Sequence, residues 1–399
     1  MTEGFEIEQY KNHLIMQILN STCIDGIKIF IENMDLLKDV SFIIPSPYCD
    51  GNNYIEPFQS LKLRDIEVNY FFNNKFLYCY NVNSIINLLC NKEDNLHVLC
   101  DVSFDTQVQS YLYRKYNGQT NTIPNSIQEV IKIINERKWT VNGFAYLYEN
   151  ALFDKNAINS ELFKENMYAF ETYFYEDQQA MQHAKQLAEL DKKFLNDEFS
   201  DWYRRQYKLY YLELLMMGYI QLNYKGTPVV YKEEEYIKFF HDNVGILSGR
   251  EANLAKLFFT HGTKIAFFGK IQKGNKNIIA SLKNMAWDIF HIQNVLNNIN
   301  MQFSENIDFI IPYFVTYDKR LKDILPVYQV KAIAFVRNEA KKWPLFETDL
   351  IDPIIHAKYF TSQAYIKRQE KLFGKKEEDI IKILDLLIDE YENKITSLV

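Results

Sequence analysis

The sequence has few cysteines, no paired-cysteine motif and no long uninterrupted apolar run. Its five cysteines are an odd number, all fall within the first hundred residues, and none belongs to a Cys-x-x-Cys pair. That usage is typical of reduced thiols in a cytosolic protein rather than of disulfides or zinc ligands. The longest apolar-looking stretch, residues 209–220, contains Glu213 and is too short to span a bilayer. Because the start also lacks a signal-peptide pattern, we expect a soluble, cytoplasmic protein without a membrane partner.

An excess of positive charge is also absent. The 45 Lys and Arg residues against 52 Asp and Glu residues give a formal net charge of −7. This balance excludes a protein whose whole surface coats nucleic acid, because neutralising phosphates requires clustered Lys and Arg. It does not exclude a nuclease, since carboxylates that bind cations add negative charge and a local basic rim can still guide a phosphate backbone.

Two familiar kinds of site are missing as well. The seven histidines are scattered, and no two of them have the i, i+4 spacing of a helical metal motif. The loop GKIQKGNK resembles a phosphate loop but lacks the Gly-Lys-Ser/Thr ending, which argues against nucleotide binding.

Sequence patterns divide the chain into three expected regions and predict an α/β fold class. Residues 1–95 have a mixed α/β pattern whose role is open: a sensor, an interface or an extension of the following sheet. The polar sequence NKEDN at residues 91–95 marks the expected boundary. Residues 96–330 alternate strand and helix patterns, and residues 331–399 end in an amphipathic helix.

A helical insertion is expected at about residues 155–245, within the second region. It is a candidate to cover a site, to dimerise or to hold a partner. After it, Ser248 and Glu251 have capping-box spacing, which predicts a helix that starts there.

Two aspartates end apolar strands just before helices. Asp105 follows VLCDVSF, and Asp318 follows FIIPYFVTY. In an open α/β sheet this position is the crevice at the carboxyl ends of the strands, where ligands bind. Strand alternation places Asp101 on the face of Asp105 and Thr316 on the face of Asp318. Helix capping is the alternative role for Asp105.

Two further acids lie on predicted helices. Glu149 borders the apolar stripe of FAYLYENALF, where a carboxylate is costly to bury unless it is paired or binds a metal. Asp288 shares a polar helix edge with Asn284 and His291, next to an apolar stripe. For both acids, a solvent-exposed helix face is the alternative interpretation.

If these four acids converge, their charges repel one another unless cations neutralise them. Ligand sets made only of oxygen favour Mg²⁺ or Mn²⁺. Such a centre suits metal-assisted phosphodiester hydrolysis, with His291 and Lys283 as candidate supporting residues near the phosphate.

The motifs resemble, in order, those of the PIN-like nuclease superfamily. SFDTQVQSYL is similar to its opening strand with an Asp-Thr-x-Val turn, YLYENAL and AWDIFHI to its helical acids, and FVTYDK to its closing Thr-x-Asp strand. The resemblance covers roughly residues 96–330 and looks particularly like the bacterial subgroup with a long helical insertion. It implies an α/β/α sandwich around a mainly parallel sheet. The catalytic and metal-binding residues that it implies are Asp105, Glu149, Asp288 and Asp318.

The resemblance also implies an activity and partners. The expected protein is a bacterial endoribonuclease, with RNA favoured over DNA and with a toxin or anti-phage role. Because an active nuclease harms its host, we expect an inhibitory or activating protein partner or a homo-oligomer. The long stretch between Glu149 and Asp288 departs from the family pattern and leaves Glu165 as a competitor for the second acid. Candidate phosphate contacts near the motifs, which are alternatively ordinary solvated charges, are Arg114, Lys115, Lys264, Lys270, Lys273, Lys276, Lys283, Lys319 and Arg320.

Three rival functions remain in view. The first is a metal-dependent DNase. A phosphohydrolase of the haloacid-dehalogenase type needs an aspartate two residues after its nucleophile, where this chain has Gln107. A non-catalytic PIN-like scaffold would be expected to lack one of the four acids, and none is missing.

Overall fold

A computed structural model describes most of the chain. The described residues are 2–47, 54–55, 61–63, 66–72, 74, 76–90, 92, 96–119, 125–154, 160–175, 178–182, 198–300, 307–336, 339 and 341–399. The expected boundary at residues 91–95 and the middle of the helical insertion, residues 183–197, lie largely outside them. Within these segments, no helix has both the length and the apolar character needed to cross a membrane.

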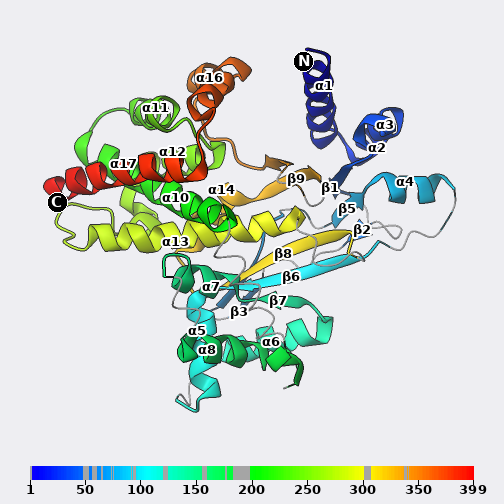
Figure 1. Ribbon diagram of the computed structural model, residues 1–399, viewed down its shortest axis with the longest axis horizontal. Coiled ribbons are helices and arrows are strands. Elements are labelled where there is room, and N and C mark those ends of the chain that lie inside the picture. The colour runs from blue at the N-terminus through cyan, green and yellow to red at the C-terminus, as the bar shows by residue number, and fades with distance from the viewer. Residues whose placement is uncertain are drawn as a thin grey trace.

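The first of two sheets in the described chain is antiparallel throughout (Figure 1). In spatial order its strands are β10 (Lys342–Phe346), β9 (Val330–Val336), β1 (Val40–Ser46), β5 (Phe76–Tyr80) and β2 (Tyr54–Ile55). One face carries a core of its own, in which Phe30 of α2 packs edge-on against Phe42 and Tyr80. The helices that contribute buried side chains to this core are α1 (Thr2–Leu19), α2 (Cys23–Glu32), α3 (Met34–Leu37) and α4 (Val82–Leu89).

The second sheet is mixed and holds the strands expected around the site. Its order is β3 (Leu61–Leu63), β4 (Ile66–Tyr70), β8 (Phe309–Thr316), β6 (Val98–Phe104) and β7 (Thr140–Asn142). β6 runs parallel to β7 and β8, whereas β4 is antiparallel to β8. Every residue of β8 is buried, as expected for a central strand covered on both faces.

The expected mainly parallel sheet is therefore only partly parallel. The difference arises because β3 and β4, from the first ninety-five residues, add antiparallel strands to the sheet that contains β6 and β8. β9 and β10, from beyond residue 329, join the first sheet instead, where β9 pairs with β1 and β10 pairs with β9. Each sheet thus combines strands from distant parts of the chain, and residues 66–70 are an extension of the sheet that carries the site.

Helices lie on both sides of the second sheet in Figure 1, with α13 above it and α5, α6 and α8 below. Long amphipathic or wholly buried stretches of sequence form these helices, as the apolar spacing predicts. The helices from α5 to α13 are α5 (Thr106–Tyr116), α6 (Asn125–Arg137), α7 (Phe144–Ala151), α8 (Glu161–Glu171), α10 (Glu198–Asn223), α11 (Val229–Phe239), α12 (Gly249–His261) and α13 (Ile278–Asn297). After β8 come α14 (Leu325–Tyr328), α15 (Pro353–Tyr359), α16 (Ser362–Leu372) and α17 (Glu377–Leu398).

The carboxy-terminal helix α17 forms as its sequence predicts and lies along α10 (Figure 1). Its apolar stripe is buried, with Leu384 and Ile395 fully covered. Glu392 accepts a hydrogen bond of 2.6 Å from Tyr211 on α10 and forms an ion pair of 3.0 Å with Lys283 on α13. α17 therefore braces the helix that bears Asp288.

The capping box expected at the start of α12 is absent. Ser248 is the N-cap residue, but its side chain makes no capping hydrogen bond. Glu251 is buried instead, and its Oε1 accepts a hydrogen bond of 2.5 Å from Nε2 of Gln293 on α13. The predicted helix start is confirmed, because α12 begins at Gly249 with Ser248 as its N-cap. The glutamate of the motif contacts Gln293, 42 residues away in sequence, instead of the N-cap.

Candidate active site

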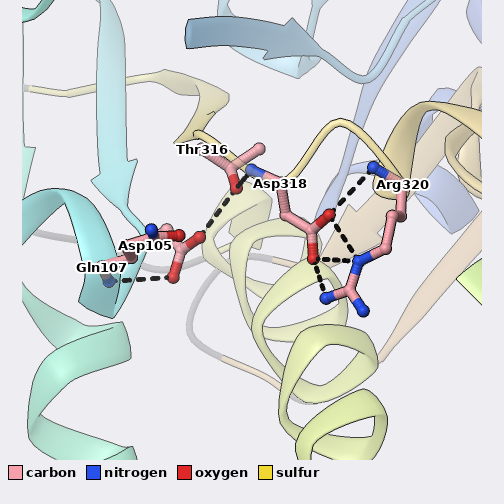
Figure 2. A network of polar contacts seen from close by, with 5 residues as sticks. All are labelled: Asp105, Gln107, Thr316, Asp318 and Arg320. Carbon is pink, nitrogen blue, oxygen red and sulfur yellow. Dashed lines mark hydrogen bonds and ion pairs between the residues drawn. The ribbon is translucent and has the colours of Figure 1, made fainter. Parts of the chain in front are cut away.

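The ends of the two parallel strands β6 and β8 bring Asp105 and Thr316 together (Figure 2). The register pairs Phe104 with Val315, so the next residue of each strand lies at the same edge of the sheet. The Thr316 hydroxyl donates a hydrogen bond of 2.7 Å to Asp105 Oδ2, and the Asp105 backbone N–H donates to Val315 at 2.9 Å. The carboxyl ends of parallel strands form the crevice in which α/β proteins bind ligands.

Asp105 also caps the helix that follows it. Its Oδ1 accepts a hydrogen bond of 3.3 Å from the backbone N–H of Gln107, at the start of α5. The two roles considered for Asp105 therefore coexist, because one carboxylate oxygen serves the helix and the other faces β8. Burial raises the pKa of this carboxyl, against the opposing effect of the hydrogen bond from Thr316.

Asp318 is held by the arginine two residues later (Figure 2). Its Oδ1 accepts hydrogen bonds from the backbone N–H of Arg320 at 2.9 Å and from Nε at 2.8 Å, while Oδ2 accepts from Nε at 3.0 Å and from Nη2. The Asp318 backbone N–H donates to the Thr316 hydroxyl at 2.9 Å. Burial raises the pKa of Asp318, but the hydrogen bonds and charge of Arg320 outweigh burial, so the pKa is lowered.

Asp288 lies on α13 and faces the same place from a different element. Its Oδ2 is shielded from solvent and accepts no hydrogen bond from any described residue. Burial raises the pKa of Asp288 well above its ordinary value, and the negative charges of Asp105, Asp318 and Glu149 raise it further. The guanidinium of Arg320 opposes them. The other three acids of the sequence motifs therefore all lie close enough to Asp288 to act on it electrostatically.

Glu149, on α7, contacts His291, which lies on α13 as Asp288 does. The Glu149 Oε2 and His291 Nε2 atoms are 3.4 Å apart, and the two side chains are 38% and 3% exposed. Burial raises the pKa of Glu149, but the hydrogen bond and charge of His291 outweigh it and the pKa is lowered. The ring of His291 stacks on Trp287 at 5.7 Å, which fixes its orientation. Glu149 is thus the partly solvent-accessible member of the group.

The competitor Glu165 has a different partner. It lies on α8, where its Oε2 accepts a hydrogen bond of 3.0 Å from the Tyr113 hydroxyl. Its charge does not contribute to the pKa shifts of Asp105 or Asp288, whereas that of Glu149 contributes to both. The structure therefore brings Glu149, and not Glu165, to the other acids.

Two of the expected supporting residues lie elsewhere. Asp101 is 2% exposed, and its oxygens accept hydrogen bonds from Thr140 at 3.1 Å, Asn142 at 2.7 Å and Asn298 at 3.2 Å. Burial raises its pKa to about 6, against these hydrogen bonds. Lys283 forms its ion pair with Glu392 of α17. Thr316 and His291, by contrast, contact site acids directly.

The sequence indicates Arg320 only as a candidate phosphate contact and does not predict its hydrogen bonds to Asp318. The available signal was the Asp-x-Arg spacing, which lets an arginine reach back to a carboxylate at the end of a strand. Because Arg320 already neutralises Asp318, the acids are not arranged as an open metal cage. Among the described residues, no three His, Cys, Asp or Glu side chains form a group able to hold a metal ion.

The donor set nevertheless has a definite chemistry. It consists of carboxylate oxygens with one hydroxyl, one imidazole and one guanidinium, at a sheet edge where ligands bind. Hard divalent cations prefer oxygen ligands of this type, and a guanidinium matches phosphate geometry. Comparison of the chain with protein-family models, with curated proteins and with solved structures found no match.

Proposed function

We propose that this protein is a metal-dependent nuclease that hydrolyses phosphodiester bonds. The observation that carries the proposal is the meeting of Asp105, Thr316 and Asp318 at the ends of β6 and β8. Asp288 and Glu149 lie close by on two helices, since their negative charges and that of Asp105 bear on one another. Four acids kept together at an accessible sheet edge cost folding free energy, because buried like charges repel. A site that binds cations explains why the fold tolerates them.

Carboxylate oxygens are the ligands that Mg²⁺ or Mn²⁺ prefers, and the acids would have to move closer together than in this structure to hold the ion. Asp105, Asp288 and Asp318 would hold the ion, with Glu149 beside them, and the buried Oδ2 of Asp288 has no hydrogen-bond partner to displace. Such an ion would neutralise the carboxylates and would supply an acidified water molecule for hydrolysis. Asp318 has to exchange its contact with Arg320 for a contact with the ion.

The other side chains of the site have supporting roles. The Thr316 hydroxyl fixes the rotation of the Asp105 carboxylate, and His291 holds Glu149. Arg320, once released from Asp318, is a bidentate donor placed to contact a phosphate oxygen. No serine or cysteine nucleophile is needed.

The resemblance to PIN-like nucleases supplies the substrate and the setting of the proposal. RNA is favoured over DNA, and the cell biology proposed is that of a cytoplasmic bacterial toxin or anti-phage effector, with an inhibitory or activating partner. Helices on both sides of a partly parallel sheet are compatible with a PIN-like α/β/α sandwich.

The test is cleavage of labelled tRNA, single-stranded RNA and single-stranded DNA with Mn²⁺, Mg²⁺ or EDTA. Wild type is compared with Asp105→Asn and Asp318→Asn, which keep the shape of each side chain. We expect metal-dependent cleavage of RNA that both substitutions reduce by at least about a hundredfold. If wild type cuts nothing with any metal, and calorimetry detects no metal binding, the scaffold alternative replaces the nuclease.

A matched pair of glutamates tests the assignment of the second acid. Glu149→Gln is expected to lower the cleavage rate about tenfold or more, whereas Glu165→Gln leaves it within about twofold. The reverse result would move the second acid to α8.

A further inference from the structure

The chain between α12 and the middle of α13 is unusually basic. Residues 252–287 contain six lysines and neither an aspartate nor a glutamate, in a protein whose formal net charge is −7. Two of these lysines are used internally, since Lys256 pairs with Glu233 and Lys283 with Glu392. The other four, Lys264, Lys270, Lys273 and Lys276, are exposed and form no ion pair with the residues that the structure describes. Positive charge is therefore concentrated here and left facing solvent.

The loop that carries these lysines is anchored rather than loose. Phe267, Phe268 and Ile271 are buried in the main core and hold the loop from beneath. The Asn275 side chain donates a hydrogen bond of 2.7 Å to the Lys270 carbonyl, which ties the two ends of the loop together. At the other end, the Ala266 backbone N–H donates to Asp323 at 3.2 Å. A charged loop fixed in this way loses little conformational entropy when it binds a ligand.

The same loop forms an open groove with a wholly polar character. Its walls carry amide side chains, a hydroxyl, two lysines and glycine backbone, with no aliphatic or aromatic side chain: Gly269, Lys270, Gln272, Lys273, Gly274, Asn275, Asn277 and Ser281. Gly274 has a φ of +86°, a conformation that L side chains rarely adopt, so the tight turn depends on glycine. Donors without apolar walls suit an anionic, hydrogen-bonding ligand.

The groove adjoins the acid site. The loop contacts the segment that follows Asp318, since the Ala266 backbone N–H donates to Asp323. Ser281 at the groove and Asp288 at the site lie on the same helix, seven residues apart, which is roughly 10 Å along its axis. One extended ligand can therefore contact both places.

We propose that this groove binds the sugar-phosphate backbone of a polynucleotide strand beside the acid site. The lysines are spread along thirteen residues rather than focused on one point, which suits a row of phosphates more than a single one. The loop also lacks a Gly-Lys-Ser/Thr ending, so a mononucleotide is the poorer fit. The path of the strand toward the acids rests on the proposed function, whereas binding to the groove does not require cleavage.

The experiment measures binding without catalysis. Fluorescence anisotropy of labelled single-stranded RNA and DNA is recorded in EDTA over a range of salt concentrations, for wild type and for Lys270→Gln/Lys273→Gln. We expect the double variant to bind at least about tenfold more weakly, with a salt slope reduced by about 1.4, since each phosphate contact on a single strand contributes about 0.7. The matched control is Lys367→Gln/Lys375→Gln, two exposed lysines on and after α16, which should bind within about twofold of wild type.

The outcomes separate the groove from the nuclease. If wild type fails to cleave with any metal but binds the strand in EDTA in a way that depends on Lys270 and Lys273, the proposed function alone would be overturned. Binding that is equal in the double variant and the control, or no binding by wild type, would overturn the groove. Displacement of the strand by adenosine monophosphate at low concentration would show a small-anion site instead.

Discussion

Two sets of carboxylates in the described chain differ in exposure and in their partners. The acids at the ends of β6 and β8 contact a hydroxyl, an imidazole and a guanidinium, and the Arg320 side chain that meets Asp318 is 36% exposed. Glu213 and Glu251, on α10 and α12, are 2% and 1% exposed. Burial and the charge of Glu251 raise the pKa of Glu213 well above its ordinary value.

The comparison shows that burial and a raised pKa do not by themselves identify a reactive site. Asp288 and Glu213 share both properties. They differ in what surrounds them, because Asp288 borders accessible polar side chains at a sheet edge and Glu213 interacts with the enclosed phenols of Tyr236 and Tyr328. Access and the chemistry of the neighbours distinguish a candidate active site from a structural pair.

The largest expected effect tests this distinction directly. Asp288→Asn should lower the rate of RNA cleavage about a thousandfold, about 4 kcal/mol, because a group that acts at the reacting centre is lost. Glu213→Gln, an equally isosteric change at a more deeply buried carboxyl, should leave the rate within about threefold. Initial rates with Mn²⁺ and thermal melting of both variants provide the measurement. Equal inactivation of two well-folded variants would remove the distinction.

A second prediction concerns Glu171, a further buried carboxyl that is not one of the four site acids. It is 2% exposed at the end of α8, and burial raises its pKa from 4.5 to about 7. The folded protein therefore holds this proton more tightly than the unfolded chain, and the free energy of unfolding falls as the pH rises from about 4.5 through about 7. The loss at pH 8 is expected to be about 3 kcal/mol.

Glu171→Gln should remove that fall, because glutamine stays neutral. Urea unfolding at pH 5 and pH 8 measures it, with wild type as the reference for the other groups that titrate in this range. Two parallel pH profiles would show that Glu171 does not carry the effect.

The smallest expected effect concerns the hydrogen bonds from the Arg320 side chain to Asp318. Arg320→Gln frees the carboxylate and leaves the site more negative, so the affinity for Mn²⁺ should rise by about tenfold, about 1.4 kcal/mol. Isothermal titration calorimetry measures it, with Arg204→Gln as the matched control, since Arg204 pairs with Asp201 and not with a site acid. An unchanged or weaker affinity would mean that Asp318 does not take part in metal binding.

Local patterns in the sequence correctly predicted the helices and strands that carry the four acids. An acid that follows an apolar run, as at Asp105 and Asp318, is at a strand end wherever that strand pairs, and a parallel register then places Asp105 next to Thr316. The helices of Asp288 and Glu149 follow equally from apolar spacing. Apolar spacing does not decide between Glu149 and Glu165 as the second acid. That choice depends on a contact between distant residues, the hydrogen bond from Tyr113 to Glu165.

The features that sequence did not predict all depend on contacts between distant residues. Asp101 shares a strand face with Asp105 by alternation, yet Asn298, 197 residues later, draws it into a separate network. β4 pairs with β8 across more than two hundred residues, which no local pattern of residues 66–70 reveals. Local propensity fixes elements, whereas their neighbours depend on the packing of the whole chain.

The order of strands has a consequence for synthesis on the ribosome. β8 lies at the centre of the second sheet and ends at Thr316, β9 and β10 complete the first sheet, and α17, made last, packs on α10 and against Lys283. A nascent chain therefore lacks the strand that leads to Asp318 until most of the protein has been translated. Assembly of the acids is thus deferred until β8 and Asp318 have been made, after α5, α7 and α13.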